Sequence, residues 1–77
     1  MKLRFTKHAL ARMRQRHIDE ELVESVVDNP EVSLLQEDGC LRHFKYIEKY
    51  GHYLRIVCKG DLVITVMPGR NFKGAKK

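Results

Sequence analysis

The spacing of apolar residues changes at Pro30, and this change limits the folds that the chain can adopt. Before Pro30, apolar residues recur at helical spacing in residues 7–17 and again in residues 19–29. After Pro30 they alternate with polar residues, as in strands that bury one face. The pattern predicts four strands, at residues 31–36, 41–50, 53–58 and 62–67. The predicted fold is therefore α+β: two N-terminal helices packed on one face of an antiparallel meander sheet of about four strands. Residues 1–5 can add a short N-terminal strand.

Side chains at the ends of both helices support these boundaries. Thr6 and Asp19 have the side-chain oxygens that cap a helix N-terminus. Ile18 and Val23 are spaced for a hydrophobic staple across the start of the second helix. The second helix is predicted to end before Pro30, because the residue preceding a proline disfavours the α conformation.

Glycines mark the turns between the strands, and the turn lengths set the predicted register. Asp38-Gly39 indicates a hairpin, and Gly51 indicates a tight turn. A three-residue loop at residues 59–61 gives a wholly apolar face, with these opposing pairs: Cys58–Leu62, Ile56–Ile64 and Leu54–Val66. Around Gly51 the expected pairs are Tyr50–Tyr53, Glu48–Arg55 and Tyr46–Val57.

The length of 77 residues predicts a single domain, residues 1–77, in which residues 68–77 form a flexible basic tail. Cys40 and Cys58 have neither disulfide-framework nor metal-ligand spacing, so we expect no metal and no other cofactor. The sequence shows no signal peptide and no apolar run of membrane-spanning length. We therefore expect a soluble, cytoplasmic protein that makes no membrane contact.

The net charge of +5 is distributed unevenly. Residues 1–17 carry six Lys or Arg and no acid, and residues 39–77 carry nine Lys or Arg against two acids. Residues 18–38 carry eight acids and no Lys or Arg. A basic surface on a small protein favours a polyanionic partner, and RNA is the partner that we expect.

Two groups of residues are candidates for contact with RNA. His8, Arg12 and Arg16 are four residues apart, so they share one side of the first helix. A histidine can transfer the 2′-hydroxyl proton of RNA and arginines can bind the phosphate, so this trio is the predicted catalytic set. The second face of the sheet is predicted to bind RNA, because aromatic and cationic side chains alternate there. The RNA-binding candidates on it are Tyr46, Tyr53, Arg55 and Thr65; Phe44 and Tyr50 are expected beside them.

Each candidate also has a structural interpretation. His8 can simply cap or pack at the start of the helix, and Arg16 can pair with Glu20. Arg55 can pair with Glu48 across two strands. His43 and His52 are assigned no role from the sequence.

The segment "HALARMRQRHI" resembles the signature of domain of unknown function 4258, a family of small prokaryotic proteins. His8, Ala9, Arg12, Met13, Arg16 and Ile18 match its spacing, and "DLVITVMP" is similar to the family's last strand, with Thr65 in the matching place. The family in turn resembles the RelE and BrnT groups of ribonuclease toxins in layout. This resemblance implies a metal-independent endoribonuclease of toxin type, with a possible inhibitory protein partner.

Two alternatives remain open. The first is a non-catalytic module that binds RNA or DNA through the same basic surface. The second is a homodimeric interaction module, for which the strand at residues 31–36 offers an exposed edge.

Overall fold

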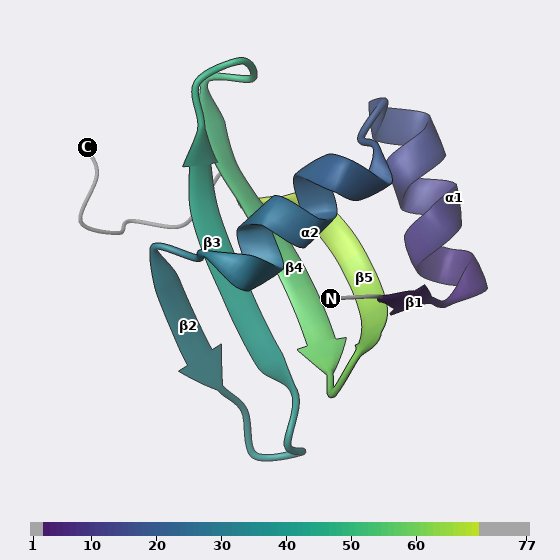
Figure 1. Ribbon diagram of the computed structural model, residues 1–77, viewed down its shortest axis with the longest axis vertical. Helices are drawn as coiled ribbons and strands as arrows, with labels where there is room; N and C mark the ends of the chain where they lie inside the picture. The colour runs from purple at the N-terminus through teal and green to yellow at the C-terminus, as the bar shows by residue number, and fades with distance from the viewer. Residues whose placement is uncertain (1–2, 70–77) are drawn as a thin grey trace.

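The computed structural model describes residues 3–69, which form two helices and five strands. The helices are α1 (Lys7–Arg16) and α2 (Glu20–Asp28). The strands are β1 (Arg4–Phe5), β2 (Val32–Leu35), β3 (Leu41–Ile47), β4 (His52–Lys59) and β5 (Leu62–Pro68). The predicted α+β class is confirmed, together with the short N-terminal strand (Figure 1).

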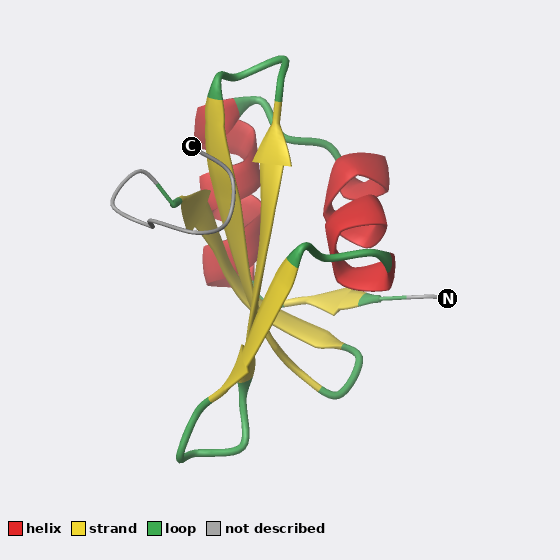
Figure 2. Ribbon diagram, turned by 90° about the vertical axis from the view of Figure 1, so that its left-hand side faces the viewer, coloured by secondary structure: helices red, strands yellow, loops and turns green. Residues whose placement is uncertain are grey.

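The five strands form one twisted sheet in the order β1-β5-β4-β3-β2 (Figures 1 and 2). Strands β2 to β5 make the predicted antiparallel meander. The sheet is nevertheless mixed, because β1 pairs with β5 in parallel. An ion pair between Arg4 and Asp61, at 2.9 Å, holds β1 beside the start of β5.

The predicted helix caps are confirmed. The Ala9 N–H donates to the Thr6 hydroxyl at 3.0 Å, and the Leu22 N–H donates to the Asp19 carboxylate at 2.9 Å. His17 ends α1 in the left-handed conformation, at φ 58°, and the following N–H of Ile18 donates back to the Met13 carbonyl. This C-terminal motif satisfies helix carbonyls and turns the chain toward α2.

Both helices pack on one hydrophobic core, α1 mainly against β5 and α2 against β3 and β4. The helices contribute buried small and branched residues, and the sheet contributes a wholly apolar set. The principal members are Ala9, Met13, Ile18, Val23, Val26, Ile47, Leu54, Ile56, Cys58, Val63 and Val66. The core therefore lies on one face of the sheet, as the alternating pattern predicts.

The predicted register between β4 and β5 is wrong. Lys59 pairs with Leu62, so Gly60 and Asp61 form a two-residue turn, and Gly60 adopts φ 60°. The ladder then shifts, because Cys58 pairs with Val63 while Val57 pairs with Thr65. Ile64 is the extra residue of this bulge. The bulge allows Val63 and Val66, three residues apart, to be buried on the same face, which simple alternation does not allow.

The predicted register between β3 and β4 is also wrong. Tyr46 pairs with Tyr53 and Ile47 with His52, so residues 48–51 form a four-residue loop. Arg55 lies opposite Phe44, and the expected Glu48–Arg55 pair does not form. The loop is longer than predicted because the N–H groups of Tyr50 and Gly51 both donate to the Ile47 carbonyl, with Gly51 at φ 74°.

At the C-terminal end, β5 continues through Pro68, and Gly69 is buried with its N–H donating to the Tyr53 carbonyl at 2.7 Å. Pro68 thus belongs to the sheet and Gly69 is tied to β4, although both were placed in the predicted tail. The rest of that tail, residues 70–77, lies outside the described residues. In residues 3–69, neither helix has the length and apolarity needed to span a bilayer.

Candidate functional site

The side chains of His8, Arg12 and Arg16 lie along one side of α1, as predicted. His8 and Arg16 are exposed, and Arg12 is half-buried. Within residues 3–69 none of the three forms an ion pair, so the expected Arg16–Glu20 pair is not present. The α-helical rise separates His8 from Arg16 by about 12 Å along the helix axis. The three side chains therefore form an extended cationic edge and do not converge on one point.

Arg16 lines a cleft that His8 and Arg12 do not line. The cleft lies between the end of α1, the loop that joins β3 to β4, and the end of β5, and its volume is about 200 Å³. It is lined by Arg16, Ile18, Tyr50, His52, Leu54 and Pro68. This volume is below the roughly 300–1,000 Å³ of pockets that enclose whole small molecules. The cleft therefore suits one phosphate or sugar unit of a longer chain that passes over the surface.

His52 brings a titratable imidazole to this cleft. It is the first residue of β4, and its position is fixed by pairing with Ile47. The Nδ1 atom lies 2.9 Å from the Tyr53 carbonyl oxygen. Because a carbonyl oxygen only accepts, Nδ1 carries the proton, and in the neutral ring Nε2 keeps its lone pair. His52 is thus held in the tautomer that can accept a proton at Nε2.

Tyr50 connects the loop to the end of α1. Its ring stacks on the His52 ring, with centroids 5.7 Å apart and planes inclined by 20°. Its hydroxyl donates a hydrogen bond to the His17 carbonyl at 3.2 Å. The two contacts keep His52 and the last turn of α1, which carries Arg16, on opposite sides of the same cleft.

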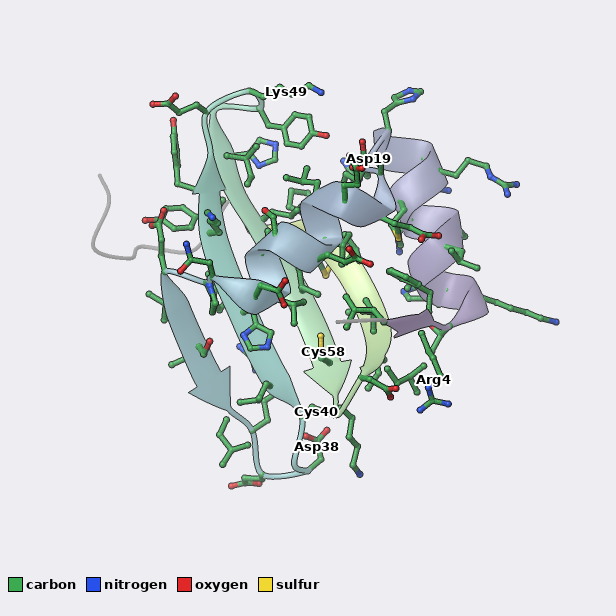
Figure 3. All side chains as sticks on the ribbon, viewed as in Figure 1. Arg4, Asp19, Asp38, Cys40, Lys49 and Cys58 are labelled. Atoms are coloured by element: carbon green, nitrogen blue, oxygen red, sulfur yellow. The ribbon has the colours of Figure 1, made fainter. Side chains whose placement is uncertain are left out.

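Cations gather around this end of the molecule. The Lys49 ammonium lies 5.9 Å from the centre of the Tyr50 ring, and Figure 3 shows Lys49 at the tip of the β3–β4 loop. Arg14 and Arg16 lie in the last turn of α1. The planar, cationic guanidinium of Arg16 suits phosphate oxygens in charge and geometry. The cleft therefore combines a fixed cation with an imidazole.

Comparison with protein families places the chain in a known family. The sequence profile of a domain of unknown function, DUF4258, matches residues 5–68. The chain is a member of the DUF4258 family. This confirms the resemblance to that family seen in residues 8–18 and in the last strand. No curated protein and no solved structure matches the chain.

The signature residues of this DUF4258 chain divide between core and surface. Ala9, Met13 and Ile18 are buried in the core, so packing explains their presence. His8 and Arg16 are exposed and make no contact that packing requires. The matched segment thus carries polar residues that fold stability alone does not explain.

The second face of the sheet holds the predicted RNA-binding residues. The observed registers bring its side chains into three rows across the strands: Tyr46–Tyr53, Phe44–Arg55–Met67 and Arg42–Val57–Thr65. The register across β3 and β4 differs from the prediction by an even number of residues, so the same side chains still share this face. Tyr50 is the exception, because it lies in the loop beside the cleft.

Burial differs among these residues. Tyr53 is only 5% exposed, and its ring meets Tyr46 edge-on at 5.5 Å. Tyr46, Arg55 and Thr65 are half-buried. A guanidinium nitrogen of Arg55 contacts the Met67 sulfur, while Arg55 Nε is buried without a hydrogen-bond partner among residues 3–69. Arg55 thus brings an unsatisfied donor to this face.

The predicted trio missed His52, which the fold brings to Arg16 from 36 residues further along the chain. No spacing in the sequence connects the two residues. The only local signal is the position of His52 directly after Gly51, in a turn next to a tyrosine. In the described part of the chain, no three His, Cys, Asp or Glu side chains form a group that could hold a metal ion.

Proposed function

We propose that this DUF4258 protein binds RNA and cleaves it without a metal ion, at the cleft between Arg16 and His52. The observation that carries the proposal is that Arg16 and His52 line the same open cleft of about 200 Å³. Arg16 supplies a positive charge there, and the hydrogen bond at Nδ1 holds the His52 imidazole in one tautomer. An open cleft suits a polymeric substrate, because only one unit of the polymer has to enter it.

The chemistry that fits these groups is transesterification within RNA. His52 Nε2 accepts the proton of a ribose 2′-hydroxyl, and the 2′-oxygen attacks the adjacent phosphorus. The bond from phosphorus to the 5′-oxygen breaks, and that oxygen takes a proton from water, which leaves a 2′,3′-cyclic phosphate and a 5′-hydroxyl; His52 then returns its proton to the solvent. Arg16 stabilises the extra negative charge on the phosphate oxygens in the transition state.

Other residues are proposed to bind the RNA chain on either side of the cleft. His8 and Arg12 extend the cationic edge of α1 away from Arg16. On the second face of the sheet, the half-buried Arg55 supplies a guanidinium charge that would attract an RNA phosphate. Tyr46 and Thr65 lie on the same face, with Tyr53 beneath Tyr46 as a buried support.

The wider analogy to RelE and BrnT ribonuclease toxins belongs to this proposal. It implies a cytoplasmic enzyme and an inhibitory protein that covers the basic surface. The support is the α+β layout with helices on one face of the sheet, together with the basic segments of the chain. Fold layout is weaker support than site chemistry, because one layout serves many functions.

The test is incubation of the purified protein with RNA in the presence of a chelator. We expect cleavage products that end in a 2′,3′-cyclic phosphate. His52→Ala should lower the cleavage rate by about 100-fold or more, as expected for loss of a general base. His17→Asn is the matched control, because His17 is exposed beside the same cleft and asparagine tolerates its left-handed backbone.

The second candidate function is RNA binding without cleavage, and the half-buried Arg55 guanidinium on the second face of the sheet favours it. In that case RNA binds but stays intact, and Arg55→Ala weakens binding more than His52→Ala does. Intact RNA after prolonged incubation with a folded, RNA-binding protein would exclude the catalytic function.

A further inference from the structure

Strand β2 forms one edge of the sheet, and no other strand among residues 3–69 lies beyond it (Figure 1). Natural edge strands are usually protected by lysine, proline or a bulge that prevents pairing with other chains. The four residues of β2, Val-Ser-Leu-Leu, include neither lysine nor proline. The edge is therefore open to another extended chain.

The backbone of β2 has hydrogen-bonding groups directed outward. The Gln36 N–H donates to the Cys40 carbonyl at 2.8 Å, and hydrogen-bonded pairs alternate along an antiparallel ladder. Val32 and Leu34 therefore bond to β3, whereas the N–H and C=O groups of Ser33 and Leu35 point away from it. An added strand would pair with these outward groups.

Among residues 3–69, three of the four exposed large apolar side chains lie on the same hairpin, and the fourth is Leu10 on α1. Leu34 is 45% exposed, Leu35 74% and Leu41 36%. Leu34 and Leu35 line an open hollow of about 590 Å³, together with Gln36, Glu37, Asp38 and Arg42. Clustered exposed leucines beside an unpaired strand are typical of an interaction surface.

The acidic residues around β2 indicate what kind of segment can pair with it. Glu31 and Glu37 flank the strand at its two ends, and Asp38 follows, all three exposed. A second copy that paired antiparallel about Leu34 would bring the Glu31 end of each β2 next to the Glu37–Asp38 turn of the other copy, twice. Like charges brought together across a strand pair destabilise it. A strand with a basic residue at each end forms favourable pairs in the same register.

We infer that the β2 edge binds an extended segment of another protein by strand addition, and that this segment has an apolar centre flanked by lysine or arginine. The surface is separate from the proposed RNA cleft. Figure 3 shows Asp38, beyond the end of β2, at the opposite end of the molecule from Lys49, beside the cleft. Failure of one proposal therefore leaves the other untouched.

The probe is a blocked heptapeptide, Lys-Thr-Val-Leu-Thr-Val-Lys, which places its lysines opposite Glu37 and Glu31. Titration into the isotope-labelled protein, followed by NMR, should shift amide signals of residues 31–37. The amides of Ser33 and Leu35 should gain protection from hydrogen exchange. A control peptide is N-methylated at the two amides that pair with Ser33 and Leu35. It should bind at least about 10-fold more weakly, because these amides can no longer donate hydrogen bonds to β2.

Two protein variants complete the test. Leu35→Pro removes an outward N–H that does not bond to β3, so the fold should persist, which a melting curve will check. Binding of the peptide should fall about 10-fold or more. Glu37→Lys spares the Glu31 carboxylate, which accepts the Tyr46 N–H, and should weaken binding of the lysine peptide roughly 3-fold. The inference is overturned by any of three results: no shifts at millimolar peptide, equal binding of the N-methylated peptide, or self-association of the free protein through β2.

Discussion

Thr6 connects the start of α1 to the bulge in β5, because its hydroxyl donates a hydrogen bond to the Ile64 carbonyl at 2.8 Å. The same oxygen accepts the Ala9 N–H as the helix cap. One side chain thus satisfies both a helix donor and the carbonyl of the extra residue in the bulge.

The first prediction concerns this double role. Thr6→Ala should lower the free energy of unfolding by about 1–2 kcal/mol, because it removes a cap and leaves the Ile64 carbonyl without its donor. Thr6→Ser keeps the hydroxyl and should stay within about 0.5 kcal/mol of the parent protein. Urea unfolding measures both variants. Equal stability of the alanine and serine variants would show that the Ile64 contact contributes nothing.

The second prediction concerns the effect of His43 on stability at different pH values. His43 is buried in β3, and its Nδ1 atom lies 2.7 Å from the Ser33 hydroxyl oxygen of β2. Burial lowers the pKa of His43. In the unfolded chain this histidine titrates near its usual value of about 6.5, so just below that pH the unfolded state binds more protons. Stability should therefore fall as pH is lowered from about 7 through that window.

The control for this prediction is His43→Gln, which can still bond to Ser33 but does not titrate. The melting temperature of the parent protein should fall more between about pH 7 and pH 5 than that of His43→Gln. Parallel curves for the two proteins would mean that His43 does not contribute to the acid sensitivity.

The third prediction concerns the thiols. Burial raises the pKa of Cys58 to about 11, and burial also raises the pKa of Cys40. Since the thiolate is the reactive form, Cys58 should react with iodoacetamide at about pH 8 at least about 100-fold more slowly in the folded than in the unfolded protein, and Cys40 should also react more slowly when folded. Mass spectrometry after timed quenching gives both rates. Rapid labelling of Cys58 in the folded state would contradict its burial.

The fourth prediction separates binding from chemistry on α1. His8→Ala and Arg12→Ala should change the free energy of unfolding by less than about 1 kcal/mol, because neither side chain forms an ion pair among the described residues. Both should weaken RNA binding modestly, and Arg12→Ala should also reduce the dependence of affinity on salt between about 50 and 200 mM.

For His8 the outcome decides between two hypotheses. If the cleft at His52 performs the chemistry, His8→Ala retains the cleavage rate at saturating RNA. A loss of about 100-fold with an unchanged melting temperature would instead restore the role predicted from the sequence.

The features that could be predicted from the sequence are those set by nearby residues. The caps at Thr6 and Asp19, the buried faces of the helices and the change to strands at Pro30 all depend on contacts within a few positions. The alternation of residues 41–47 also placed Phe44 and Tyr46 on one face correctly.

The incorrect predictions concern contacts between segments that are far apart in the sequence. The bulge at Ile64 exists because Val63 and Val66 both reach the core, and no local pattern encodes that choice. The parallel pairing of Arg4 with Leu62 depends on strands at the two ends of the described chain. The cleft was missed for the same reason, since Arg16 and His52 meet only after the sheet and α1 have assembled.

The pairing of β1 with β5 also has a consequence for biosynthesis. Arg4 and Asp61, which form the ion pair between these segments, are 57 positions apart, and α1 packs against β5 as well. During synthesis the N-terminal strand and helix leave the ribosome long before their partner strand exists. Their apolar sides, including Ala9 and Met13, stay uncovered until β5 has emerged, so the nascent chain passes through a prolonged stage in which chaperones can bind it.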